Sequence, residues 1–103
     1  MAIHETAVIS EKAEIHEDAV IGPFCVIKGQ VKVGAGTVLE SHVSLGNDNG
    51  IVELGERNHI LPGACVGGPP QDLKYDGEAT KLIIGNDNVI RECATLNLSL
   101  IHI

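Results

Sequence analysis

The chain has 103 residues, with 14 Asp and Glu against 7 Lys and Arg, which gives a formal net charge of −7. This length allows a single domain, and the acidic charge argues against nucleic acid or an anionic membrane as the main partner. One Phe, one Tyr and no Trp occur, so the apolar content comes from 31 Ile, Val and Leu, of which 22 are β-branched. Such a composition favours strands around a narrow core.

Branched aliphatic residues recur at every sixth position in the first half of the chain. These residues are Ile3, Ile9, Ile15, Ile21, Ile27, Val33, Leu39 and Leu45. The positions four residues later are mostly small or β-branched: Ala7, Ala13, Ala19, Cys25, Val31, Thr37, Val43 and Asn49. A period of six fits neither an amphipathic helix nor a plain hairpin meander. It is typical of a parallel β-helix in which three short strands and three corners make a turn of about 18 residues.

The repeat is interrupted twice. After Leu45 the frame slips by three residues within the segment GNDNGIVELG, which we interpret as a bulged corner, and it resumes at Leu54. Residues 67–83, GGPPQDLKYDGEATKLI, break the pattern again. Because Val66 and Ile84 are 18 residues apart, the frame survives this break, so we predict a loop extruded from the solenoid at about 67–83. A disordered linker between two small domains is the alternative.

No segment resembles a membrane anchor or a secretion signal. The chain has no apolar run of about 18 residues, and residues 1–14 are interrupted by Glu and Lys. The chain has an odd number of cysteines, Cys25, Cys65 and Cys93, and no CxxC pair. We therefore interpret these cysteines as small buried hydrophobic residues. The sequence therefore predicts a cytoplasmic protein.

The histidines and the turn residues suggest no catalytic or metal centre. His4 and His16 fall on different faces of the predicted solenoid, and His42 and His59 occupy different positions of the repeat, so we interpret the histidines as solvated and predict no metal site. Residues 86–88, Asn-Asp-Asn, are predicted to form a turn. The sequence contains no nucleophile elbow and no phosphate-binding glycine loop.

The densest polar cluster lies in the predicted loop, in the segment Gln71-Asp72-Leu73-Lys74-Tyr75. On a projecting loop, a carboxylate could accept hydrogen bonds from the hydroxyls of a sugar, and an ammonium group could attract a diphosphate. An ordinary solvated loop would contain the same residue types, so the residues alone leave both interpretations open.

Several segments together closely resemble one family of transferases. They are the opening hexapeptides, IGPFCVI with GAGTVLESHV after it, the loop GGPPQDLKYDGE and the segment IGNDNVIRECATLN. They are similar to the amino-terminal part of the bacterial acyl-carrier-protein:UDP-N-acetylglucosamine O-acyltransferases, which catalyse the first step of lipid A biosynthesis. The resemblance covers about residues 3–97, and PPQDLKY is far more specific than the hexapeptides, which many acyl- and acetyltransferases share.

The resemblance implies a left-handed parallel β-helix and a homotrimer with active sites between neighbouring subunits. It implies transfer of a 3-hydroxyacyl chain from the phosphopantetheine thioester of acyl carrier protein to the 3-hydroxyl of UDP-N-acetylglucosamine, with no metal and no other cofactor. By the same resemblance, Gln71, Asp72 and Lys74 would bind the substrate, with Asp72 near the reacting sugar and Lys74 supplying positive charge.

The chain also departs from this family. The family's general base is a His on a later coil, beyond residue 103, so no catalytic residue is assigned here. Residues 1–97 are predicted to form the repeat domain, and residues 98–103, LSLIHI, an atypical tail. We therefore expect an incomplete copy that turns over negligibly by itself. Another hexapeptide-repeat acyl- or acetyltransferase stays an alternative, as does a structural β-helix, although the few Thr share no frame.

Overall fold

The computed structural model describes residues 2–68, 80–91, 95–97 and 101–102. Its strands in chain order are β1 (Ala2–Ile3), β2 (Val8–Ile9), β3 (Glu14–Ile15), β4 (Val20–Ile21), β5 (Val26–Val33), β6 (Val38–Leu39), β7 (Ser44–Leu54), β8 (His59–Ile60), β9 (Cys65–Gly68), β10 (Thr80–Ile84), β11 (Val89–Ile90), β12 (Thr95–Asn97) and β13 (Ile101–His102). Within these residues no helix has the length and apolar character that crossing a membrane would require.

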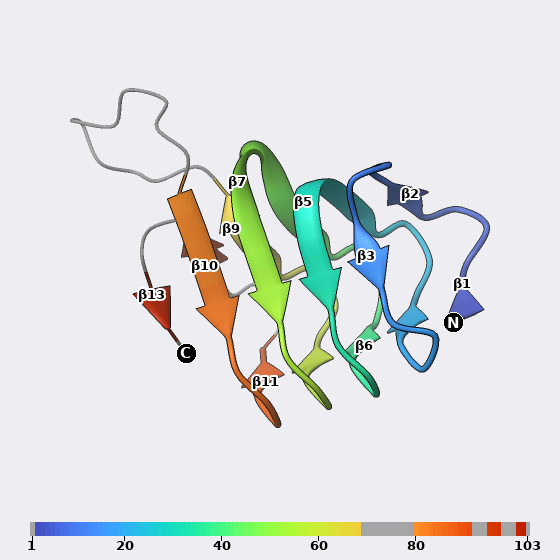
Figure 1. Cartoon of the computed structure of the whole chain (residues 1–103). Helices are drawn as coiled ribbons and strands as arrows, with labels where there is room; N and C mark the ends of the chain where they lie inside the picture. Colours follow the sequence, from blue (N-terminus) through green and yellow to red (C-terminus); the bar gives the residue numbers. More distant parts are fainter. Residues whose placement is uncertain (1, 69–79, 92–94, 98–100, 103) are drawn as a thin grey trace.

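The strands stack as a three-sided parallel solenoid. One side is the sheet β1-β4-β6-β8-β11, in which every pair is parallel. The other two sides form one continuous sheet, because β5 and β7 each run along both sides and around the corner between them. Figure 1 shows β3, β5, β7 and β10 side by side across the front, with β6 and β11 behind them. The predicted all-β solenoid of hexapeptide repeats is confirmed.

The core consists of the aliphatic residues of the six-residue repeat. Ile3 pairs with Ile21 and Ile21 with Leu39, so one turn advances by 18 residues. From the second turn onward the described side chains at these positions are buried, as are most small residues four positions later. The buried apolar residues are Ala19, Ile21, Cys25, Ile27, Val31, Val33, Leu39, Val43, Leu45, Val52, Leu54, Ile60, Ala64, Val66, Leu82, Ile84 and Ile90.

The first turn is less well covered than the turns that follow. Ile3 is 38% exposed, whereas Ile21 and Leu39, below it in the same stack, are 1% and 0% exposed. Ile9 and Ile15 are partly buried and pack against the core. The reason is geometric, because in the described structure these residues have a neighbouring turn on one side only.

The first interruption of the repeat is a bulged corner within β7, as predicted. Gly29 of β5 pairs with Asn47, and the next residue, Gln30, pairs with Ile51. Residues 48–50 are therefore three extra residues in β7. The pairing of β5 with β7 is regular again up to its end at Val33 and Leu54.

The second interruption is narrower than the predicted loop at 67–83. β9 continues through Gly68, and β10 begins at Thr80, where it pairs with Gly50 of β7. Residues 67–68 and 80–83 therefore belong to strands, because backbone pairing with the adjacent turn continues on both sides of the break. Ile84 pairs with Leu54, which shows that the six-residue frame resumes in register.

Two further expectations concern the cysteines and the tail. Cys25 is buried as predicted, but Cys65 is exposed, because it occupies the outward position of β9 immediately before the buried Val66. The prediction of a buried residue is thus wrong for Cys65, and Cys93 lies outside the described residues. Ile101 and His102 pair with β10, so these two residues continue the parallel pairing. The predicted domain boundary at residue 97 stays a prediction.

The core predicts a clear contrast between two valines. Val33 is 2% exposed and Val8 is 61% exposed. Val33→Ala should lower the free energy of unfolding by about 2 kcal/mol, because it removes two buried methyl groups and leaves a cavity. The control Val8→Ala should change it by less than about 0.5 kcal/mol. Urea denaturation followed by circular dichroism measures both, and equal losses would contradict the inward position of Val33.

Candidate functional site

Both interruptions of the repeat occur at the same corner of the solenoid. The β7 bulge and the break between β9 and β10 each separate the same two sides of the solenoid, on consecutive turns. In Figure 1, β7 curls over at the top, beside the end of β9 and the start of β10. We call this place the insertion corner and define it by residues 46–50, 67–68 and 80. This corner is the candidate functional site, because the chain departs from the six-residue repeat there.

Two glycines make the insertion corner possible. Gly46 and Gly67 adopt left-handed backbone conformations, with φ of 91° and 80°. A Cβ at Gly46 would lie 2.1 Å from the carbonyl oxygen of Lys28, and a Cβ at Gly67 would lie 2.4 Å from a methyl group of Val52. Both positions therefore require glycine for conformation and for space.

The predicted substrate-binding residues Gln71, Asp72 and Lys74 lie outside the described residues. The structure does describe the strands that flank them, β9 up to Gly68 and β10 from Thr80. Their assignment to the substrate site therefore stays a prediction.

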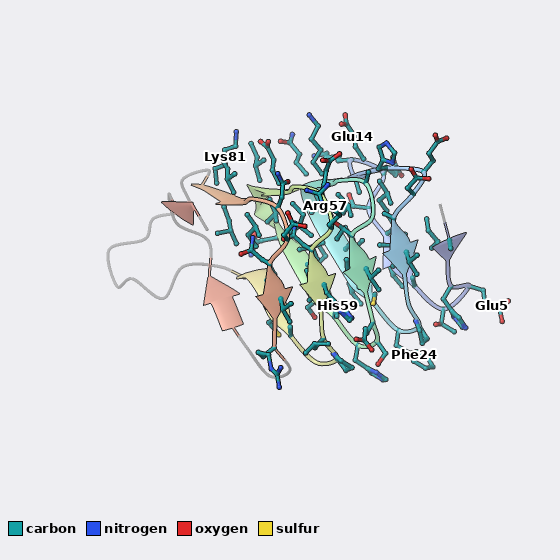
Figure 2. The ribbon with its side chains drawn as sticks, turned by 90° about the horizontal axis from the view of Figure 1, so that it is seen from below. Glu5, Glu14, Phe24, Arg57, His59 and Lys81 are labelled. Atoms are coloured by element: carbon teal, nitrogen blue, oxygen red, sulfur yellow. The ribbon has the colours of Figure 1, made fainter. Side chains whose placement is uncertain are left out.

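A shallow depression of about 300 Å³ lies on the side formed by β3, β5 and β7. Its lining residues are Lys12, Glu14, Gln30, Val31, Lys32, Ile51, Val52 and Glu53. Ile51 pairs with Lys81, the residue after Thr80, so the depression begins next to the insertion corner. Figure 2 shows the side chains of Glu14 and Lys81 projecting on the same side of the ribbon.

Charges of opposite sign alternate along this side. Lys32 is paired with Glu14 on one neighbouring strand and with Glu53 on the other. The Lys81 ammonium lies 2.7 Å from a Glu53 carboxylate oxygen, and this hydrogen bond lowers the pKa of the Glu53 carboxyl. Because cations and carboxylates offset one another, the depression does not favour an anion such as a diphosphate.

His4, His16, His42 and His59 lie on the surface, as the sequence suggested, and away from the insertion corner. His59 contacts Glu40 through its Nε2 atom on the outer face of the sheet that contains β8. The ring of His42 packs against Phe24 at 5.1 Å between ring centroids. The part of the chain that the structure describes contains no group of three His, Cys, Asp or Glu residues placed to hold a metal.

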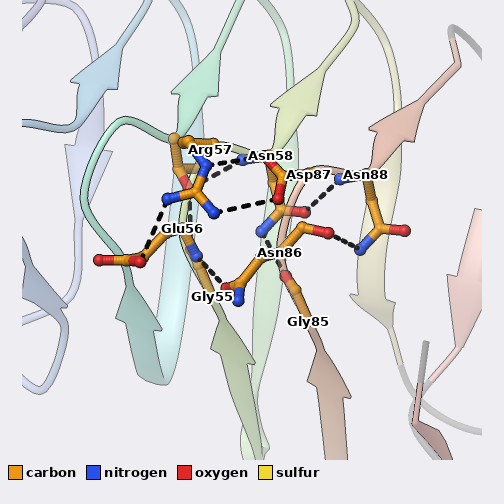
Figure 3. Close-up of polar contacts among 9 residues, drawn as sticks. Gly55, Glu56, Arg57, Asn58, Gly85, Asn86, Asp87 and Asn88 are labelled. Atoms are coloured by element: carbon orange, nitrogen blue, oxygen red, sulfur yellow. Dashed lines mark hydrogen bonds and ion pairs between the residues drawn. The ribbon is translucent and has the colours of Figure 1, made fainter.

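A second corner is held by polar contacts at the turns of Arg57 and Asp87 (Figure 3). The guanidinium of Arg57 donates to both carboxylate oxygens of Asp87, at 2.7 and 3.0 Å, and also to Glu56 at 3.3 Å. Arg57 lowers the pKa of the Asp87 carboxyl, mainly through this hydrogen bond. Both groups are exposed, so the pair orients the corner but contributes little to stability. Asn86 and Asp87 occupy the turn that the sequence predicted.

Beneath this corner, polar side chains form a ladder inside the solenoid. The Thr37 hydroxyl donates to the Gly55 carbonyl at 2.9 Å. The Asn58 amide group donates to the Gly85 carbonyl at 2.7 Å and accepts from the Asn88 N–H at 2.9 Å. The ladder satisfies backbone groups that the solenoid interior would otherwise leave unpaired. The sequence indicates this ladder only through position, since Asn58 and Asn88 stand four residues after aliphatics of the repeat.

Comparison with known proteins finds clear similarity to one group of acyltransferases. Residues 3–49 match the family of bacterial transferase hexapeptide repeats. An acyl-(acyl-carrier-protein)–UDP-N-acetylglucosamine O-acyltransferase of Thermodesulfovibrio yellowstonii is 50% identical over 95 residues, which are 92% of this chain and 36% of the relative. This chain is a homologue of these acyltransferases. It spans about a third of the length of the curated relatives it matches.

Solved structures of the same group show the same fold. The UDP-N-acetylglucosamine O-acyltransferase of Moraxella catarrhalis superposes with a TM-score of 0.88 at 46% identity, over 94% of this chain and 37% of the other. The protein of Acinetobacter baumannii gives 0.88 at 49% identity, over 94% of this chain and 36% of the other. The homology therefore extends through both interruptions of the repeat.

Removing the buried side-chain amide of Asn58 should destabilise the fold. Asn58→Ala leaves the Gly85 carbonyl and the Asn88 N–H without their partner, so the free energy of unfolding should fall by about 2–4 kcal/mol. The matched control is Asn86→Ala, which removes an exposed acceptor for the Glu56 N–H and should cost about 1 kcal/mol or less. Urea denaturation measures both variants. A smaller loss for Asn58→Ala than for Asn86→Ala would argue against the ladder.

Titration of the carboxyl groups can distinguish the ion pair of Arg57 with Asp87 from that of Lys81 with Glu53. Arg57→Gln should raise the pKa of Asp87 toward its ordinary value and leave Glu53 unchanged, whereas Lys81→Gln should do the reverse. Both carboxyls have lowered pKa values in the folded state, so their stabilising effect is present above the unfolded-state pKa and is lost as the pH falls through the folded-state pKa. Carboxyl chemical shifts recorded against pH give the two midpoints. A midpoint of Asp87 that does not move in Arg57→Gln would refute this cause.

Proposed function

We propose that this chain serves in O-acyl transfer from acyl carrier protein to UDP-N-acetylglucosamine, the first step of lipid A biosynthesis. The observation that supports this most is the 50% identity to such an enzyme over 92% of this chain, which includes the segment between β9 and β10. Residues in that segment, PPQDLKY, are the specific ones, whereas hexapeptides alone are shared by many transferases. A purely structural solenoid would have no reason to keep this segment.

In the proposed reaction, the sugar 3-hydroxyl oxygen attacks the thioester carbonyl of the 3-hydroxyacyl group. The new C–O bond forms, the C–S bond breaks, and the phosphopantetheine thiol leaves with a proton. Asp72 is proposed to accept hydrogen bonds from the sugar hydroxyls, Lys74 to attract negative charge, and Gln71 to bind through its amide. The acyl chain arrives on acyl carrier protein, so no further cofactor and no metal are proposed.

The reaction also needs a general base within hydrogen-bond reach of the sugar hydroxyl. Among the described histidines, His4, His16 and His42 lie on other corners, His59 lies in β8, and His102 lies in β13 beside β10. We therefore propose that the base is a His other than these, on a further coil of the solenoid.

Assembly as a homotrimer in the cytoplasm belongs to the same proposal. The outer face of the sheet β1-β4-β6-β8-β11 carries exposed apolar side chains, with Val20 at 41% and Val89 at 59% exposure. Exposed aliphatics on a flat sheet are suited to a subunit contact, because burial against another subunit removes them from water.

The proposal predicts specific binding of the sugar nucleotide. UDP-N-acetylglucosamine should bind this chain, and Lys74→Ala or Asp72→Ala should each weaken binding about 10- to 100-fold, the effect of losing one charged hydrogen bond. Isothermal titration calorimetry measures the dissociation constants. Lys32→Ala, on the side with alternating charges, is the matched control and should bind as the unaltered chain does. Equal binding by the Lys74 and Lys32 variants would contradict the proposed role of Lys74.

A further inference from the structure

We infer that His4, Ser10 and His16 cap the first turn of the solenoid, and that the two histidine corners of this cap open when the imidazole rings gain a proton. The first turn contains β1, β2 and β3 and lies at one end of the stack in Figure 1. Its aliphatic side chains are less well covered than those of the turns that follow, so its corners matter for its stability. The inference does not depend on the proposed function.

The three residues of the cap occupy the same place in the repeat. Each directly follows an aliphatic residue of the repeat and begins a four-residue corner, 4–7, 10–13 or 16–19, in which the N–H of the fourth residue donates to the carbonyl of the first. The side chain of the first residue accepts a further hydrogen bond from the N–H of the third. These further bonds join Thr6 to His4 Nδ1 at 3.2 Å, Lys12 to Ser10 Oγ at 3.1 Å and Asp18 to His16 Nδ1 at 3.0 Å.

In later turns the equivalent N–H has a different partner. It donates to a backbone carbonyl of the preceding turn, as from His42 to Pro23 at 3.1 Å and from Arg57 to Ala35 at 2.9 Å. The first turn has no preceding turn in the described structure, and its three side chains take the place of these carbonyls. Terminal repeats of a solenoid need such substitutes, because backbone groups there lack a neighbouring coil.

Two of the three acceptors can change charge near neutral pH. An unprotonated ring nitrogen accepts a hydrogen bond, whereas both nitrogens of a protonated imidazole are donors. The N–H groups of Thr6 and Asp18 would then face another donor, so both bonds break. Imidazole ordinarily changes charge between about pH 5 and 8, whereas the Ser10 hydroxyl stays an acceptor throughout this range. The Ser10 corner is therefore an internal control within the same turn.

His4 also connects the cap to the second turn. The Thr6 hydroxyl lies 2.8 Å from His4 Nδ1 and accepts the Phe24 N–H at 2.9 Å. After protonation the ring can donate to this hydroxyl oxygen, but the Thr6 N–H loses its acceptor. The ionisable groups next to His4 are Glu5 on the same corner and the buried Cys25 thiol on the adjacent corner, residues 22–25. The negative charge of Glu5 favours the protonated ring, and therefore the open corner.

More charges surround His16. Its Nδ1 lies 4.0 Å from the Asp18 carboxylate, Glu17 adjoins it in the sequence, and it lines a shallow depression together with Glu14 and Lys32. The carboxylates favour the protonated ring and Lys32 opposes it. Attraction between the protonated ring and the Asp18 carboxylate also offsets part of the lost hydrogen bond. Opening should therefore be larger at the His4 corner than at the His16 corner.

Amide hydrogen exchange of this chain, measured by NMR at pH values above and below the titrations of both rings, tests the cap. The imidazole proton shifts show when each ring has titrated, and the rates are converted to protection factors against an unstructured peptide at the same pH. On protonation the protection factor of the Thr6 amide should fall about three- to tenfold, the equilibrium factor of one net hydrogen bond. That of the Asp18 amide should fall less, and that of the Lys12 amide should not change.

Substitutions separate the acceptor from the charge. His4→Asn supplies a side-chain acceptor that does not titrate, so the Thr6 amide should stay protected at both pH values. His4→Ala should lose this protection at both. The matched control is Ser10→Ala, which should remove the protection of the Lys12 amide alone, at either pH.

Unchanged protection of the Thr6 amide while the His4 ring titrates would overturn the inference. An equal loss at the Lys12 amide would do the same, because it would show that the whole turn loosens instead of the histidine corners. Both outcomes are measured on the unaltered chain, so neither depends on the folding of a variant.

Discussion

Parallel backbone pairing between each turn and the next is the interaction on which the whole structure depends. It places residues 18 positions apart side by side, so that Ile3, Ile21 and Leu39 form one stack. A single turn buries little, and only the stacking of neighbours creates an interior. The same constraint confines every irregularity to a corner, because extra residues within a strand would shift all later side chains out of the core. The insertion corner is therefore a consequence of the core.

The period of six allowed most of the fold to be predicted from the sequence, since each aliphatic residue of the six-residue repeat points into the interior of the solenoid. The slip after Leu45 was also predictable, because Gly and Asn mark it. The exposure of Cys65 was not predictable, because outward-facing and inward-facing positions are only one residue apart in strands this short. Nor could the frame alone show that β10 begins at Thr80, since β-ladder pairing there depends on Gly50 in another turn.

The candidate site was predictable only in part, and for a different physical reason. Gln71, Asp72 and Lys74 were recognised by their chemistry and by resemblance, and neither depends on the repeat. The pairing of Thr80 with Gly50 has no such signature, because it depends on backbone placement. Corners illustrate the same limit, as Phe24 and His42 adopt left-handed conformations, with φ of 58° and 55°, that their residue types do not announce. Stacking of the turns over-determines these conformations and outweighs their local cost.

The ladder of the buried Thr37 and Asn58 and the half-buried Asn88 affects how the chain reaches its native arrangement. The hexapeptide repeats are similar to one another, so a folding chain could stack one turn of the solenoid against the wrong turn and still bury aliphatic side chains. An amide in such a misassembled stack would face hydrocarbon without its partner, at a cost of several kcal/mol. The hydrogen bonds that Thr37 and Asn58 make across three consecutive turns therefore distinguish the native order of the turns from the many orders that hydrophobic burial alone would accept.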